Sequence, residues 1–190
     1  MDIVGLVKST QVVDLVLIAL LAVALVGGIV QGALRGLEGF VAIILAFVVA
    51  ANLANPFGNF LAGNWKQLPA GYNHMLAFLI VFLLLAVGAI IGLFFLTPRT
   101  EIKPGQPAVD DAFGAFFGLV EAIVILACIV IIFRSYDMPL PFKGDIEPLH
   151  RVYDMINFDS HIAAGLRSGV APIIVHLLAP FLPASIVALF

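Results

Sequence analysis

Four apolar runs of membrane-spanning length are the feature that most constrains this chain. They cover residues 12–30, 37–54, 74–96 and 112–133. A helix needs about 20 mostly apolar residues to cross the hydrocarbon core of a bilayer. Within lipid a helix also satisfies its own backbone hydrogen bonds. The runs therefore predict an all-α, polytopic transmembrane helix bundle of about four spans over residues 12–133, preceded by a short segment, 1–11.

The composition agrees with this fold class and excludes several kinds of function. Only 11% of the 190 residues are charged and 63% are hydrophobic, whereas about a quarter of a soluble domain is charged. We therefore expect the lipid bilayer to surround much of the surface. The net charge of −3 and the absence of a basic run argue against nucleic acid as a partner. One cysteine cannot form a disulfide within the chain.

The last part of the chain, residues 134–190, reads as a polar linker followed by an apolar segment. Ser160 favours a helix start near the beginning of that segment. Arg167 and three prolines, at positions 172, 180 and 183, interrupt it. We expect amphipathic helices that lie at the membrane interface or re-enter it, in preference to a fifth span.

Basic residues in the short connections set the expected orientation. The connections 31–36 and 97–111 contain Arg35, Arg99 and Lys103, whereas the basic residues of the other side are spread over longer segments. Short cytoplasmic loops carry an excess of Lys and Arg. This density predicts that both termini are external, although a raw count of basic residues favours the reverse. The short first connection also predicts a tight hairpin of the first two spans.

Glycines recur every four residues in the apolar runs. Residues four apart share a helix face, and glycine there lets two helix backbones approach closely, which supplies packing energy in lipid. We expect these faces to pack the bundle, with a homo-oligomer or another membrane protein as the alternative partner. The glycines are Gly28, Gly32 and Gly36, then Gly88 and Gly92, and then Gly114 and Gly118.

Four polar residues within or beside the apolar runs are candidates for a functional site. Glu121 lies near the middle of the fourth run, where a carboxylate is costly unless it is paired, solvated or protonated. It fits either a proton or cation relay or a neutral carboxyl buried between helices. Arg35 and Glu38 are expected to pair across one helical turn. Asp14 is expected to stabilise the start of its own helix.

No chemistry of an enzyme is evident. The chain contains no phosphate-binding loop, no His-Glu-x-x-His and no Gly-x-Ser-x-Gly sequence. Four possible metal ligands occur near one another in the sequence, but the spacings between them match no usual metal-binding pattern. We therefore expect no metal and no cofactor. The four residues are His150, Asp154, Asp159 and His161.

Three stretches resemble the colicin V production protein (CvpA) family of bacterial membrane proteins. The first is the acid that opens the first span, in Val13-Asp14-Leu15-Val16-Leu17-Ile18. The second is the glycine- and arginine-containing connection Gly28-Ile29-Val30-Gln31-Gly32-Ala33-Leu34-Arg35-Gly36. The third is Asp111-x-x-Gly114-x-x-x-Gly118 at the entry to the fourth span. Two departures are Glu121, where family members commonly carry a basic residue, and the displacement of the carboxylate that follows Arg35 to Glu38.

The resemblance implies a four-span protein of the bacterial cytoplasmic (inner) membrane that is tied to toxin export and envelope stress. It implies no agreed biochemical activity, and the external protease domain of some relatives is not expected here. The leading hypothesis is a non-enzymatic scaffold or accessory protein in envelope homeostasis or toxin secretion. Two alternatives stay open. One is a small proton-coupled transporter or channel component centred on Glu121, and the other is an accessory subunit of a large respiratory or photosynthetic complex.

Overall fold

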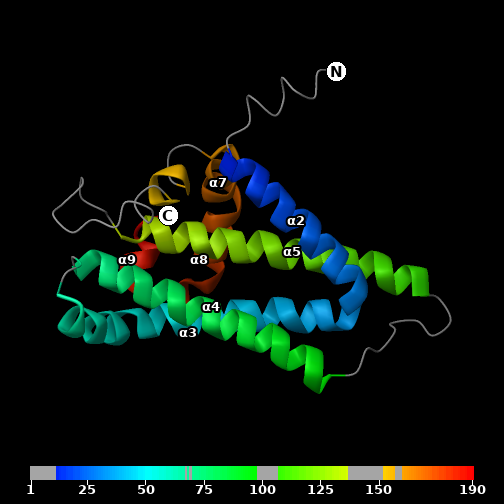
Figure 1. The fold of residues 1–190 in the computed structure, drawn as a ribbon, viewed down its shortest axis with the longest axis horizontal. Coiled ribbons are helices and arrows are strands. Elements are labelled where there is room, and N and C mark those ends of the chain that lie inside the picture. Colours follow the sequence, from blue (N-terminus) through cyan, green and yellow to red (C-terminus); the bar gives the residue numbers. More distant parts are fainter. Residues whose placement is uncertain (1–11, 67, 69, 98–106, 137–151, 157–159) are drawn as a thin grey trace.

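The predicted fold class is confirmed: the chain forms a bundle of long apolar helices (Figure 1). The computed structural model describes residues 12–66, 68, 70–97, 107–136, 152–156 and 160–190, and no strand occurs among them. The four long helices are α2 (Val12–Gln31), α3 (Ala33–Asn64), α4 (Ala70–Leu96) and α5 (Pro107–Arg134). Each is long and apolar enough to cross a membrane.

Helix α5 is the centre of the bundle. It packs against α2 on one side and against α3 on the other, and α4 packs mainly on α3 (Figure 1). The expected tight hairpin of the first two spans is wrong, because α2 diverges from α3 and makes most of its contacts with α5. The glycines of α2 fit those of α5, and this close fit outweighs the proximity that the short connection provides.

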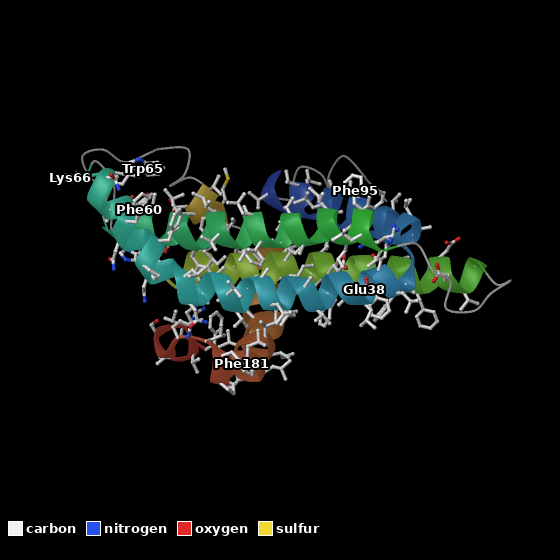
Figure 2. The ribbon with its side chains drawn as sticks, turned by 90° about the horizontal axis from the view of Figure 1, so that it is seen from below. Glu38, Phe60, Trp65, Lys66, Phe95 and Phe181 are labelled. Carbon is white, nitrogen blue, oxygen red and sulfur yellow. The ribbon has the colours of Figure 1, made fainter. Side chains whose placement is uncertain are left out.

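Aromatic side chains fill the space between α3 and α4. The Phe47 ring lies 5.6 Å from that of Phe78 and meets the Phe82 ring edge to face at 5.9 Å. All three side chains are fully buried. Such pairs contribute about 0.5–1.5 kcal/mol beyond the burial of their area. Trp65 and Lys66 follow the end of α3 (Figure 2), a position that suits the headgroup layer.

Helix α3 is longer at both ends than the predicted span of 37–54. It begins at Ala33 because the preceding residue, Gly32, has a φ of 81°. This backbone conformation is not helical, so α2 and α3 are separated by this one residue. Helix α3 continues to Asn64 through Pro56, although proline removes one backbone hydrogen bond. Packing against α4 stabilises the helix beyond this proline. Gly58 lies directly against His74, and Nε2 of His74 is 3.1 Å from Oδ1 of Asn59. The other three helices extend the predicted spans by one to five residues at an end.

The C-terminal segment forms one continuous helical path with changes of winding. It comprises α7 (His161–Gly165), the π-helix η2 (Leu166–Val170), α8 (Ala171–Leu178) and the 3₁₀-helix η3 (Ala179–Phe181), and α9 (Ala184–Val187) follows. By length and composition the path His161–Phe181 is a fifth candidate span. In Figure 1 it crosses α5 at a steep angle, and in Figure 2 Phe181 and Phe95 of α4 lie on opposite sides of the bundle.

Candidate functional site

Asp14 caps a helix other than its own. It is 3% exposed, and its Oδ2 accepts a hydrogen bond from the backbone N–H of His161 at 3.2 Å. Its Oδ1 accepts one from the N–H of Ile162 at 3.2 Å and one from the Ser160 hydroxyl. Ser160 in turn accepts from the N–H of Ala163 at 3.0 Å. The carboxylate therefore stabilises the positive N-terminal end of the helical path His161–Phe181, called the C-terminal helix below, whereas the sequence predicts that it stabilises the start of α2.

Asp110 makes the same kind of contact at the opposite end of the bundle. It lies near the start of α5 and is fully buried, and its Oδ1 accepts a hydrogen bond from the backbone N–H of Ala33 at 3.3 Å. Ala33 is the first residue of α3, so a carboxylate again meets a helix N-terminus. Sequence reasoning missed this role, since no local pattern joins two residues 77 positions apart.

Arg35 caps the C-terminal end of α4, and the expected pair with Glu38 is wrong. Its Nε donates to the backbone carbonyl of Thr97 at 2.9 Å, and its Nη2 donates to the same oxygen. The guanidinium also lies over the Phe94 ring, 5.2 Å from the centroid. Glu38 is exposed. The carbonyl end of a helix carries partial negative charge, so it competes well for the cation against a solvated carboxylate.

Asn52 completes the pattern at the other end of the C-terminal helix. Its Nδ2 donates to the carbonyl of Phe181 at 2.9 Å and to that of Val48, in its own helix, at 2.8 Å. Carboxylates thus lie at helix N-termini, and N–H donors lie at helix C-termini. In a chain with so few charges, these polar side chains satisfy the backbone groups at helix ends, and among them only Asn52 is exposed.

Replacement of Asn52 by alanine is expected to loosen the end of the C-terminal helix and leave the rest of the bundle intact. One net hydrogen bond is worth about 1 kcal/mol, which corresponds to roughly fivefold faster exchange. Hydrogen exchange of residues 171–181 measures this effect. Asn64→Ala is the matched control, because among the described residues the Asn64 side chain donates only to Phe60 of its own helix. Equal exchange in the two variants would contradict the role of Asn52.

The glycines of α2 and α5 form a close helix crossing. A Cβ atom on Gly28 or Gly114 would overlap a carbonyl oxygen of the other helix, and one on Gly118 would lie 2.5 Å from the carbonyl oxygen of Ala24. The α-carbon of Gly32 lies against Gly114 in the same crossing. Since the neighbouring atoms are backbone, they cannot move aside as a flexible side chain would. Helix α2 therefore packs only because these positions have no side chain.

A second glycine face joins α3 to α5. A Cβ on Gly36 would lie 2.6 Å from Cβ of Phe117. By contrast, a Cβ on Gly88 or Gly92 of α4 would have no neighbouring atom within 4 Å, so the packing expected of these two glycines inside the bundle is not found. Gly88 instead lines a shallow apolar groove of about 490 Å³ on the outer face of α4, together with Leu84 and Val87. Spacing alone does not distinguish an inward glycine face from an outward one.

Glu121 is buried half way along α5, and it caps none of the described helices. Its side chain is 6% exposed, and its Oε1 has no hydrogen-bond partner among the described residues. That oxygen occupies the space beside Gly39 of α3 that a Cβ would otherwise take. The Nε2 of Gln31, at the end of α2, lies 3.5 Å from the same space. The carboxyl is therefore enclosed where α2, α3 and α5 meet.

The described residues contain no group of three or more His, Cys, Asp or Glu side chains that could hold a metal ion. Of the residues weighed in the sequence as ligands, His150 and Asp159 lie outside the described part of the chain. Cys128 is fully buried among apolar side chains of the core.

A family model described as colicin V production protein matches residues 13–145 of the chain. The match includes α2, α3, α4 and α5, and with them Asp14, Arg35, Asp110 and both glycine faces of α5. Searches of curated proteins and of solved structures found no match. The matched range is well over half of the chain and agrees with the resemblance seen in the sequence. The chain belongs to the colicin V production protein family.

Proposed function

We propose that this multi-pass membrane protein is a non-enzymatic scaffold or accessory protein that acts in envelope homeostasis or toxin secretion. The observation that carries the proposal is the use of its polar side chains. Asp14, Arg35, Asn52 and Asp110 all bind helix ends, and this use supports a structural role for them within the bundle. The family description, production of colicin V, supports a role in toxin secretion.

The outer surface of the bundle supports contact with other membrane proteins. Much of α2 and α4 is uncovered by the rest of the chain, as at Val23 (70% exposed) and Leu84 (69%). The glycine pair of α4 faces outward and would allow another helix to approach closely. A second copy of this chain or another membrane protein would bury this face, which lipid covers otherwise.

Complementation by Glu121→Gln separates the scaffold from the transport alternative. Glutamine keeps the shape of the side chain and its capacity to hydrogen-bond, but it cannot gain and lose a proton. If the protein is a scaffold, we expect the variant to accumulate to the normal level and to complement the envelope-stress defect fully. Glu38→Gln, on the exposed side of α3, is the control. Normal abundance of Glu121→Gln without rescue would favour a proton-coupled transporter and count against the scaffold.

We further propose that the chain lies in the bacterial cytoplasmic membrane with both termini external, on the basis of the basic residues in its short connections. Cysteine placed at Ser135 should react in intact cells with a membrane-impermeant thiol reagent, and cysteine at Thr100 should not. Cys128 is fully buried and gives little background. Labelling at position 100 but not at 135 would reverse the orientation.

A further inference from the structure

Glu121 differs from the polar residues that hold the bundle together. Asp14 and Asp110 each bind backbone N–H groups at a helix N-terminus. Glu121 is as well buried, but no described residue donates a hydrogen bond to its Oε1. A buried acceptor without a partner is unfavourable, and more so when it is charged. The site beside Gly39 therefore disfavours the anion and leaves the carboxyl without a fixed structural partner.

The charged groups on the neighbouring helices do not compensate for a negative charge at this position. On α3, Arg35 is bound to the end of α4 and Glu38 is exposed. On α2, the neutral Gln31 amide has its Nε2 3.5 Å from the place that a Cβ of Gly39 would take. No ion pair joins Glu121 to any described residue. The remaining titratable or charged residues on the elements packed against α5, and on α5 itself, are Asp14, Tyr72, His74, Asp110, Asp111, Cys128, Arg134, His161, Arg167 and His176.

We propose that Glu121 is a reversible proton-binding site at the junction of α2, α3 and α5. In the closed bundle the side chain is the neutral acid, and the O–H bond breaks to give a carboxylate and a hydrated proton when water reaches the junction. The anion cannot stay enclosed beside Gly39 without a partner, so release of the proton is coupled to loosening of the contact between α3 and α5. This goes beyond a scaffold function, because it gives the bundle two states that differ by one proton.

Glutamate labelled with ¹³C at the side-chain carboxyl tests the site directly. The chain has four glutamates, at positions 38, 101, 121 and 147. Solid-state NMR of the protein in liposomes, with the same buffer inside and outside, distinguishes the acid from the carboxylate signal. At neutral pH we expect one acid signal, which Glu121→Gln removes and Glu38→Gln leaves in place. On alkaline titration this signal should move to the carboxylate position and return when the pH is lowered.

Two outcomes would overturn the proposal. If Glu121→Gln removes a carboxylate signal at neutral pH, the side chain is ionised and has a cation partner. If its acid signal does not respond to alkaline pH, the proton is permanently held. The triple variant Glu38→Gln, Glu101→Gln, Glu147→Gln keeps Glu121 as the one labelled glutamate, so the test stands even where Glu121→Gln does not accumulate. These spectra do not depend on complementation, so they fail or succeed independently of the scaffold function.

Gly39→Ala provides a second test of the geometry. The added methyl would occupy the place of the Glu121 carboxyl, so the side chain must leave the enclosed space, and its acid signal should shift or disappear at neutral pH. Gly63→Ala on the same helix is the control, because a Cβ at position 63 meets open space. An acid signal that is the same in Gly39→Ala as in the unaltered protein would show that the carboxyl does not lie beside Gly39.

Discussion

Replacing Gly118 with leucine is expected to prevent α2 from packing on α5. Even a Cβ at this position would lie 2.5 Å from the carbonyl oxygen of Ala24 and 2.7 Å from the α-carbon of Gly28. Overpacking costs about 1–3 kcal/mol in a core that can adjust, and a backbone neighbour cannot adjust, so we expect at least about 3 kcal/mol. Thermal unfolding in detergent, with the yield of monodisperse protein, measures the loss.

Gly88→Leu and Gly92→Leu are the matched controls for this substitution. They introduce the same side chain at glycines of the same spacing, but they meet open space on the outer face of α4. Both variants should extract and unfold like the unaltered chain. If Gly118→Leu is equally stable, the α2–α5 crossing is not set by backbone contact between glycines.

Replacing Asp14 with alanine is expected to release the N-terminal end of the C-terminal helix from α2. Three hydrogen bonds to the carboxylate would be lost, those from the Ser160 hydroxyl and from the backbone N–H groups of His161 and Ile162. Each bond to a charged group contributes about 1.5–3 kcal/mol, although such contributions do not add fully, so we expect about 3 kcal/mol. This corresponds to about a hundredfold faster local hydrogen exchange over residues 160–170.

Ser168→Ala is the control for the capping variant, because within the described part of the chain the Ser168 hydroxyl of η2 donates only to the carbonyls of Ala164 and Gly165 in α7, just before it. Asp14→Asn should give an intermediate effect, since the amide keeps one acceptor oxygen. If Asp14→Ala leaves exchange over residues 160–170 unchanged, the packing of η2 and α8 on α5 alone holds the C-terminal helix.

The four spans could be predicted from the sequence because lipid imposes a simple requirement of length and apolarity on each helix. The end of α3 could not be predicted in this way. Pro56 and the asparagines near it are local signals for a helix end, but contacts of Gly58 and His74 between α3 and α4 outweigh them. Local signals decide a helix boundary only where no tertiary contact opposes them.

The candidate site was predicted only in part, for a similar reason. Burial of Glu121 followed from its place in an apolar run. The partners of Asp14 and Asp110 did not, because the hydrogen bonds join residues 146 to 148 and 77 positions apart. Gly39 has no partner at the four-residue spacing in its own helix, so the spacing of glycines could not reveal that it makes room for Glu121.

Native mass spectrometry of the protein, extracted from its own membrane in mild detergent, tests the scaffold proposal most directly. A scaffold should leave the membrane in an assembly of fixed stoichiometry, with copies of itself or with another membrane protein. That assembly should persist in Glu121→Gln and weaken in Gly88→Leu and Gly92→Leu, which keep the fold. Two results together would contradict the scaffold proposal. The protein would be monomeric in every mild detergent, and the variant with both α4 glycines replaced would still complement the envelope-stress defect.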